Sequence, residues 1–409
     1  MQLIPPPAPY QIVGRDFLAS RRHALLADEM RVRKSRQAIM AAQKVLAEDI
    51  LVVCPAIAVP HWRREFSRWW EGEWQNEPLV LSYDRMRRSW PELSQQRFDV
   101  AIVDECHFAK SPEAQRTKLV YGKNGLGWIS ERLWALSGTP ATKHAGELWP
   151  MLRAFGVVNM DYDGFVNYYC TVNKFTLQIT GTKPDKIHEV RALLAKVMLR
   201  RTRKEVAPEM PAIDFQFLEV EPESQADIDL PKGLSEAQLA QWLEDNGKTD
   251  RQDRIAVADA KVLPLAKEID FNLQNKLLRQ TVVFGWHTEP LEHLCRLLNN
   301  TGIRAELLTG KTSSAQRERV QTNFKLGLTD VVVGNILAAG TAIDLSVASH
   351  GYFLELDWLP SNNIQAANRL ISLDKKEPVT YDVVTWPGSA DDRVQRTLIR
   401  RTNELSQLY

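Results

Sequence analysis

The sequence has few cysteines and no long apolar segment. Only four cysteines, Cys54, Cys106, Cys170 and Cys295, occur in 409 residues, and no two of them form a CxxC pair. This spacing argues against a disulfide framework or a zinc knuckle and favours a reducing compartment. The longest nearly apolar stretch, residues 50–60, contains two prolines and is far shorter than the roughly 20 residues that cross a bilayer. We therefore expect no membrane span, and the first residues lack the pattern of a signal peptide.

The chain also has no excess of one charge sign. It contains 52 basic and 51 acidic residues, which gives a net charge of +1. A global basic field is excluded, so any nucleic-acid binding must come from local patches. Hydrophobic residues make up 44% and charged residues 25%, which is typical of globular proteins. The length predicts two or three domains, at roughly 150 residues per domain.

Short apolar runs alternate with helical patterns in two stretches of the chain. The first stretch covers residues 10–155 and has runs at 23–27, 50–54, 79–82, 100–103 and 133–136. The second begins near residue 262 and has runs at 281–284, 305–308, 331–333, 351–355 and 379–384. This alternation predicts an α/β protein whose parallel sheets are flanked by helices on both faces. We predict a first lobe at 1–215 with a small helical insertion, a linker at 216–260, and a second lobe at 261–409 with a C-terminal helix.

Two carboxylates follow the apolar run 100–103. Asp104 and Glu105 stand where that strand ends, and ligands of open α/β sheets bind at the carboxyl ends of strands. Mg²⁺ often takes one or two protein carboxylates together with phosphates, and a second acid can activate water for attack on a γ-phosphate. A strand followed by a solvated acidic turn explains these two residues equally well.

The segment from Leu25 to Ser35 has the order strand, loop, Lys-Ser, helix. In a phosphate-binding loop, Lys34 would contact the β- and γ-phosphates and Ser35 the metal, at the helix N-terminus. Asp28 and Arg33 occupy the two glycine positions of the pattern GxxxxGK[ST]. The second glycine normally lets backbone amides approach the phosphates without a Cβ. By the pattern alone, a basic helix cap with a solvated lysine is the better interpretation.

Two further segments carry polar groups. Ser137-Gly138-Thr139-Pro140 follows the run 133–136 and would reach the acids of a neighbouring strand, unless it is a plain Gly-Pro turn. Arg369 follows Gln365 on a predicted helix, where its guanidinium would bind a phosphate across a domain cleft. A single arginine on a surface helix is the commoner case.

Taken together and in order, these segments resemble the motifs of the Swi/Snf-type branch of the superfamily-2 helicases, with Asp104–His107 similar to its DExH box. Further segments match other motifs: Pro9-Tyr10-Gln11 (glutamine motif), Leu51–Pro55 with Trp62 (Ia), Ser82-Tyr83-Asp84 (Ib), Leu199–Thr202 (an LRRT segment), Val282–Phe284 (IV), Gly340 with Asp344 and Leu345 (V, in part), and Trp358, Pro360, Gln365 and Arg369 (VI, in part). The similarity runs over nearly the whole chain and is nearest to compact, annealing-helicase-like and phage or bacterial members.

The resemblance implies two RecA-like lobes with ATP between them and duplex DNA across both. It assigns Gln11 to adenine, and Lys34 and Ser35 to phosphate and Mg²⁺, beside Arg33. Asp104 would hold the metal and Glu105 would activate water, while Arg369 would contact the γ-phosphate. It also implies that Asp344 and Gln365 contact the nucleotide and that Ser137 and Thr139 couple hydrolysis to DNA. A DNA-facing or coupling position is implied for Tyr83, Arg85, Arg200 and Arg201.

Three residues depart from the family pattern. Arg33 occupies the phosphate-loop glycine, Ala342 a motif V glycine, and Ser372 the second motif VI arginine, which usually acts as the arginine finger. Such a finger is worth about 10³–10⁵ in rate, so its loss implies a slow enzyme unless another cation substitutes. Arg33 is either that cation or a residue that occludes the phosphate pocket.

Three functions follow from this pattern. The first is a DNA-dependent ATPase that translocates on or remodels duplex DNA, which the retention of Asp104 and Glu105 favours. The second is a degenerate clamp that binds DNA or a protein partner with weak or lost nucleotide hydrolysis. The third, an RNA helicase, fits less well because Pro9–Gln11 and Leu199–Thr202 resemble the DNA-translocating branch. We expect a monomer, in the cytoplasm of a bacterial or phage-infected cell, or in the nucleus if the source is eukaryotic.

Overall fold

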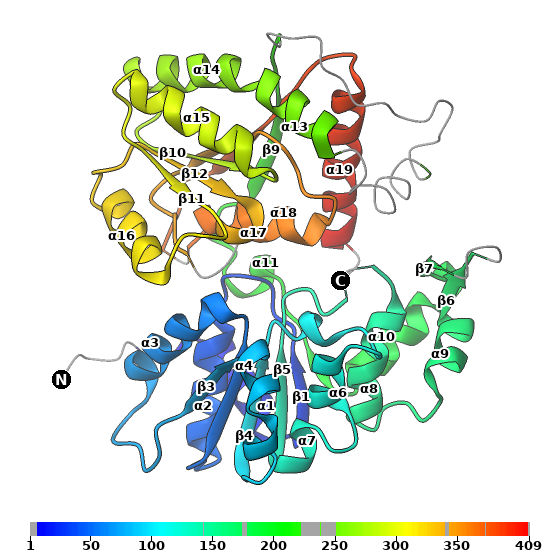
Figure 1. Cartoon of the computed structure of the whole chain (residues 1–409). Coiled ribbons are helices and arrows are strands. Elements are labelled where there is room, and N and C mark those ends of the chain that lie inside the picture. The colour runs from blue at the N-terminus through cyan, green and yellow to red at the C-terminus, as the bar shows by residue number, and fades with distance from the viewer. Residues whose placement is uncertain are drawn as a thin grey trace. The chain divides into compact units, whose positions relative to one another are not determined.

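The computed structural model describes residues 6–141, 143–173, 178–221, 238, 251–339, 343–372 and 374–407. The chain divides into two compact units, Met1–Ala207 and Pro208–Tyr409 (Figure 1). In the described part of the chain, no helix is both long and apolar enough to cross a membrane.

Unit 1 is built on a six-stranded sheet of order β3-β2-β4-β5-β1-β8. Neighbouring strands are parallel throughout. Because helices cover both faces, the central strands are continuous apolar runs rather than alternating ones. The strands are β1 (His23–Leu26), β2 (Ile50–Cys54), β3 (Leu79–Ser82), β4 (Phe98–Asp104), β5 (Ser130–Leu136) and β8 (Met198–Leu199).

Two apolar clusters lie on the two faces of this sheet. Successive strand residues point to opposite faces, so Leu51 and Val53 enter one cluster while Val52 enters the other. A two-stranded antiparallel hairpin, β6 (Cys170–Val172) and β7 (Ile179–Thr182), stands apart from the sheet. The helices of unit 1 are α1 (Pro9–Ala19), α2 (Lys34–Lys44), α3 (Val59–Trp69), α4 (Tyr83–Arg88), α5 (Trp90–Leu93), α6 (Gln115–Tyr121), α7 (Leu126–Ile129), α8 (Trp149–Ala154), α9 (Tyr162–Tyr169), α10 (Ile187–Ala195) and α11 (Arg203–Val206).

Unit 2 repeats this plan with a second six-stranded sheet, of order β11-β12-β10-β13-β14-β9. Its neighbouring strands are also parallel. The strands are β9 (Ile213–Glu219), β10 (Thr281–Gly285), β11 (Ala305–Leu308), β12 (Val331–Asn335), β13 (His350–Phe353) and β14 (Val379–Thr385).

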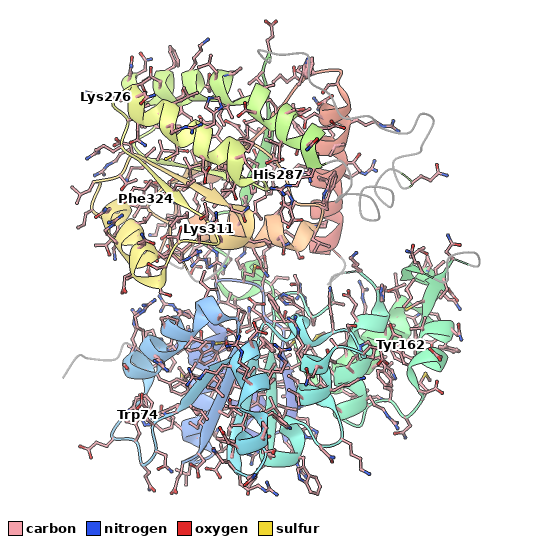
Figure 2. The ribbon with its side chains drawn as sticks, in the orientation of Figure 1. Trp74, Tyr162, Lys276, His287, Lys311 and Phe324 are labelled. Carbon is pink, nitrogen blue, oxygen red and sulfur yellow. The ribbon has the colours of Figure 1, made fainter. Side chains whose placement is uncertain are left out.

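Helices pack against this second sheet, and Phe324 of α16, labelled in Figure 2, is fully buried. Leu265 and Ile269 of α14 and Leu291 of α15 share one apolar cluster with Val283 of β10. The helices are α13 (Arg251–Ala260), α14 (Val262–Gln274), α15 (Thr288–Asn300), α16 (Ser314–Lys325), α17 (Ile336–Ala339), α18 (Pro360–Ala367) and α19 (Ala390–Gln407).

The predicted fold class, two α/β lobes with parallel sheets, is confirmed. The structure divides the chain between residues 207 and 208, earlier than the predicted end of the first lobe at 215. The reason is β9, which pairs with β14 along its whole length and therefore belongs to the second sheet (Figure 1). Most of the predicted linker, residues 222–237 and 239–250, lies outside the described residues.

Candidate nucleotide site

The carboxyl edge of the unit 1 sheet gathers the predicted chemical groups. β1 leads into the loop that carries Asp28 and Lys34, β4 ends at Asp104, and β5 leads to Ser137. Because β5 lies between β4 and β1, these three strand ends are neighbours at one edge of a parallel sheet. Open α/β sheets bind their ligands at this edge.

The loop before α2 has an unusual backbone. Arg31 has φ 70° and Arg33 has φ 55°, and Arg33 is the residue that precedes the first turn of α2. Only glycine adopts this left-handed conformation at little cost, so other residues here are strained by roughly 1–2 kcal/mol. The loop thus keeps a glycine-type backbone at two arginines. The pattern GxxxxGK[ST] singles out Arg33 but not Arg31, and the only sign of Arg31 in the sequence is its place in the same loop.

The side chains of Arg33 and Lys34 point to different partners. The guanidinium of Arg33 lies 5.7 Å from the ring centre of Trp69 on α3. The amine of Lys34 donates hydrogen bonds to the carbonyl oxygens of Asp28, at 2.8 Å, and of Glu29, at 3.2 Å. Burial lowers the pKa of Lys34, and the nearby carboxylates of Glu105, Asp28 and Asp104 oppose that shift. Lys34 is therefore held within the loop and is not a solvated helix cap.

Arg200 and Arg201 hold this loop from the segment that follows β8. The buried carboxylate of Asp28 accepts hydrogen bonds from Arg201 Nε at 3.0 Å and Nη2 at 2.5 Å. Arg200 Nη1 donates to the carbonyls of Ala27 and Gly138, at 3.0 and 2.9 Å. The sequence predicts a DNA-facing or coupling position for both arginines, and that role stays a prediction; the structure gives them partners inside unit 1. The cause is the pairing of β8 with β1, which places residues 200 and 201 against the loop that follows β1.

Asp104 and Glu105 form a close acidic pair. Asp104 Oδ2 accepts a hydrogen bond from Trp62 Nε1 at 2.8 Å, and Oδ1 accepts one from the backbone N–H of Glu105 at 3.0 Å. Burial, and then the charge of Glu105, raise the pKa of Asp104 to about 6. Two carboxylates so close together repel each other unless a proton or a cation lies between them. Trp62 was noted as part of a motif, but its hydrogen bond to the acid was not predicted.

These oxygens fit a hard divalent cation. Mg²⁺ binds carboxylate and hydroxyl oxygens and often keeps further positions for phosphates and water. The carboxylate of Asp104 and the hydroxyl of Ser35, in the first turn of α2, would provide two oxygens and leave those further positions open. Among the described residues, no three His, Cys, Asp or Glu side chains form a set that would bind a metal. An ion held by Asp104 and Ser35 would complete its coordination with phosphate oxygens or water.

A chain of side chains connects Glu105 to the loop after β5. His107 Nδ1 lies 3.3 Å from Glu105 Oε2 and 3.1 Å from Ser137 Oγ. Ser137 Oγ in turn accepts a hydrogen bond from the backbone N–H of Thr139 at 3.1 Å. Burial lowers the pKa of His107 to about 4, so its ring is neutral near pH 7. The structure thus brings Ser137 and Thr139 close to the acids through His107. In the sequence, His107 is noted only as part of the DExH box.

Tyr83 connects the same acids to an exposed basic helix. Its hydroxyl donates to the carbonyl oxygen of Asp104 at 2.8 Å, while Arg85, Arg87 and Arg88 of the same helix, α4, are exposed. Tyr83 is buried and therefore serves as a link between α4 and the acids rather than as a surface contact. Arg85 is exposed, and its contact with DNA stays a prediction.

Gln11 of α1 is buried beside α2. Its Oε1 accepts hydrogen bonds from the backbone N–H of Ala8 at 3.0 Å and from Arg36 Nη1 at 3.2 Å. The guanidinium of Arg36 stacks on Trp69, 4.1 Å from the ring centre. Arg36 was not among the predicted site residues.

In unit 2, the predicted residues gather around one turn. Arg369 lies in the 3-10 helix η5 (Asn368–Leu370), and its Nη1 donates to the carbonyl of Ile343 at 3.4 Å. The backbone N–H of Leu345 donates to the carbonyl of Arg369 at 3.1 Å. Gln365 is buried on α18, and Asp344 is exposed. Thus motif V and motif VI segments pack together.

Two of the three residues that depart from the family pattern, Ala342 and Ser372, belong to unit 2. Gly340 and Ala342 lie outside the described residues. One cation near Ser372 is Lys375, whose backbone N–H donates to the carbonyl of Ser372 and whose amine donates to the carbonyls of Ser346 and Ala348, at 2.8 and 2.6 Å. That amine has a structural role in unit 2, so Lys375 is a poor substitute for an arginine at residue 372.

Comparisons with known proteins show which families the sequence is similar to. Residues 72–228 match the model of the SNF2-related domain, and residues 261–373 match that of the helicase conserved C-terminal domain. The chain is 27% identical over 426 residues to the SWI/SNF-related matrix-associated actin-dependent regulator of chromatin subfamily A-like protein 1 of Xenopus tropicalis, covering 98% of this chain and 44% of that protein. It is 25% identical to the human DNA annealing helicase and endonuclease ZRANB3, covering 96% of this chain and 40% of the relative.

A solved structure supports the fold. The helicase domain of Hef from Pyrococcus furiosus matches with a TM-score of 0.52 at 14% identity, covering 96% of this chain and 98% of that one. The chain spans less than half the length of the Xenopus and human relatives.

Proposed function

Because the chain belongs to the Swi/Snf-type branch of the superfamily-2 helicases, we propose that it is a DNA-dependent ATPase that translocates on or remodels duplex DNA. The observation that carries the proposal is the assembly of Lys34, Asp104, Glu105 and Ser137 at one edge of the unit 1 sheet. Each of these groups has a distinct task in phosphoryl transfer, which depends mainly on positioning and charge stabilisation.

Lys34 would bind the β- and γ-phosphates of ATP. Its amine now donates to two backbone carbonyls, and phosphate oxygens would replace these neutral acceptors with charged ones, which form stronger hydrogen bonds. Ser35 and Asp104 would hold Mg²⁺, which neutralises phosphate charge when it is bound. Arg33, with its guanidinium at Trp69, would act at the rim of this loop.

Glu105 would orient the attacking water and accept its proton. The neutral ring of His107 joins Glu105 to Ser137, so a shift of the loop that contains Ser137 and Thr139 alters the position of the base. The family resemblance assigns Arg369 to the γ-phosphate, and Asp344 and Gln365 to further nucleotide contacts.

DNA would act on the same acids through α4. Arg85 and its exposed basic neighbours would bind the backbone of duplex DNA without reading its sequence. Tyr83, at the start of that helix, holds the carbonyl of Asp104. This short connection gives a physical route by which DNA binding changes the geometry of hydrolysis.

A second candidate is a clamp that binds DNA without turnover. It is favoured by Ser372 in the place of the second motif VI arginine, since no guanidinium at that residue would stabilise the transition state. We propose the ATPase first because the acids, the lysine and the coupling serine are assembled. A monomer in the nucleus or cytoplasm remains our expectation for the state of the chain.

The test is phosphate release from ATP and Mg²⁺, with no nucleic acid, with duplex DNA, or with duplex RNA. The proposal expects a slow basal rate that duplex DNA raises and RNA does not. DNA binding without phosphate release above the buffer control would favour the clamp, and stimulation by RNA alone would contradict a DNA-directed enzyme.

A further inference from the structure

A buried arginine of unit 2 lies outside the segments that resemble family motifs. Arg254 of α13 is 3% exposed. Its Nη2 donates a hydrogen bond to the carbonyl oxygen of Leu356 at 3.0 Å, and its guanidinium lies 3.9 Å from the ring centre of Trp358. A planar guanidinium that stacks and donates at the same time has a defined direction. Arg254 therefore holds the segment that follows β13 from a helix 102 positions earlier in the chain.

Two buried carboxylates flank this contact. Glu355 and Asp357 stand on either side of Leu356 and are 3% and 1% exposed. Arg254 Nη2 lies 3.9 Å from Glu355 Oε1, which is too far for a hydrogen bond. Glu355 instead accepts a hydrogen bond from the backbone N–H of His287 at 2.9 Å, and its Oε1 lies 2.7 Å from Nδ1 of that histidine, labelled in Figure 2. The segment is thus tied to the end of β10 as well as to α13.

The same segment leads into the helix that precedes Arg369. The backbone N–H of Asp357 donates to Asn363 Oδ1 at 2.8 Å, and Asn363 Nδ2 donates to the carbonyl of Asp357 at 2.9 Å. The backbone N–H of Leu359 donates to Oδ1 of Asp357 at 3.0 Å. These hydrogen bonds fix the start of α18 against the segment, and α18 runs directly into η5, which contains Arg369. The direction of Arg369 therefore depends on where the segment lies.

General stability is a weak reason for an arginine at residue 254. A buried ion pair is often no more stabilising than apolar side chains of the same volume, because the charges lose their hydration. Nη1 of Arg254 is buried and has no hydrogen-bond partner among the described residues, which adds a further cost. An apolar side chain could not supply the directed hydrogen bond to the carbonyl of Leu356 together with stacking on Trp358.

We propose that Arg254 is a positioning residue for Arg369, because it sets the place of residues 355–359 and, through α18, the direction of that arginine. The inference rests on the proposed function, in which Arg369 is assigned to the γ-phosphate. A cation that stabilises the transferring phosphoryl group acts mainly in the transition state, so its displacement lowers kcat more than it raises KM. A misplacement of about 1 Å costs up to about 10²-fold in rate.

The experiment compares the native chain with Arg254→Met, Arg254→Lys and the control Lys261→Met. Lys261 is also a buried cation of unit 2, and its amine donates to Asp391 Oδ2 at 2.8 Å and to the carbonyl of Val384 at 3.0 Å. Both methionine variants lose a buried positive charge, but Arg254→Met is the one that removes the contacts with residues 356–358.

Three measurements are made on each full chain. Steady-state phosphate release with duplex DNA gives kcat and KM for ATP, at a temperature at which all the variants are folded. Scanning calorimetry gives the melting temperature. Hydrogen exchange, followed by mass spectrometry, gives the protection of the backbone over residues 359–370 and does not depend on turnover.

We expect both methionine variants to melt below the native chain. Arg254→Met should lower kcat by about tenfold or more, with a smaller change in KM, and should speed exchange over residues 359–370. Arg254→Lys keeps the charge and a donor but not the planar stack, so its kcat should fall between those of Arg254→Met and the native chain. Lys261→Met should keep the native kcat and the native exchange over residues 359–370.

An unchanged kcat in Arg254→Met overturns the inference, as does an equal loss of kcat in Arg254→Met and Lys261→Met, which would reflect a general loss of stability. If Arg254→Met does not fold, Arg254→Lys decides, and a native kcat in that variant overturns the inference. If the native chain releases no phosphate with duplex DNA, the proposed ATPase fails. The exchange of residues 359–370 then decides the inference by itself, and equal exchange in Arg254→Met and the native chain overturns it.

Discussion

Replacement of Arg201 tests how the phosphate loop is held. The side chains of Arg201 and Asp28 are 14% and 0% exposed, and two hydrogen bonds join them. Arg201→Met keeps most of the aliphatic volume and removes the charge. In Arg201→Met, the buried carboxylate of Asp28 would keep one of its described side-chain donors, Gln37 Nε2, at 3.2 Å.

The expected loss of stability is large. Removal of one partner from a buried ion pair costs about 3–5 kcal/mol, because the other charge stays buried without compensation. In a domain of about 200 residues, 1 kcal/mol shifts the melting temperature by roughly 2–4 °C. We therefore expect the transition of unit 1 to fall by about 6–20 °C in Arg201→Met.

Scanning calorimetry, together with DNA binding by fluorescence anisotropy, measures this effect. Arg85→Ala is the matched control, since Arg85 is an exposed arginine and its replacement should lower DNA affinity without moving the transition. If Arg201→Met melts like the native chain and binds DNA more weakly, Arg201 is a DNA contact and the loop-clamp reasoning is wrong.

Three further predictions concern α4 and the coupling chain. Arg85→Ala with Arg88→Ala should lower the slope of log affinity against log salt by about 0.9 for each lost phosphate contact, measured by anisotropy at several KCl concentrations; an unchanged slope would exclude these residues from the DNA interface. The pKa of His107 is about 4 in the folded chain and about 6.5 in the unfolded chain. The unfolded chain therefore binds a proton at a higher pH, so the free energy of unfolding should fall as the pH drops from about 6.5 to 4. Denaturant unfolding at pH 7 and pH 5 should show a smaller fall in His107→Gln, and an equal fall would contradict the buried neutral ring. Ser137→Ala breaks the contact with His107 and should reduce the DNA stimulation of phosphate release more than the basal rate; an equal reduction of both would show that Ser137 does not couple them.

Much of the fold follows from the sequence for a simple physical reason. Strands covered on both faces of a parallel sheet are continuous apolar runs, and the runs at 50–54 and 281–284 correspond to β2 and β10. The rule that ligands bind at the carboxyl edge of such sheets then places Lys34, Asp104 and Ser137 at one edge. The structure brings these three residues together as expected.

The hydrogen-bond partners of Arg200 and Arg201 could not be predicted from the sequence. A basic cluster has the same appearance whether its partner is a DNA phosphate or a buried carboxylate. The choice depends on the pairing of β8 with β1, between residues more than 170 positions apart. The strand β9 was missed for a related reason. The residues that follow it are polar and resemble a linker, and its strand character depends on hydrogen bonds with β14, which is distant in the sequence.

Arg31 and Arg36 show another limit of pattern reasoning. Arg31 was hidden because GxxxxGK[ST] leaves its position open, although the backbone there is left-handed. Arg36 forms its contacts with residues of α1 and α3, which are distant in the sequence. Neither the strain nor the hydrogen bond between Arg36 and Gln11 is visible before the elements pack.

Steady-state phosphate release by Glu105→Gln, with saturating duplex DNA and Mg²⁺, tests the central claim most directly. Glutamine keeps the size of the side chain and removes its capacity to accept a proton, so the rate should fall by about 10²–10⁴ while ATP binding is retained. Equal turnover in the native chain and Glu105→Gln would contradict the account.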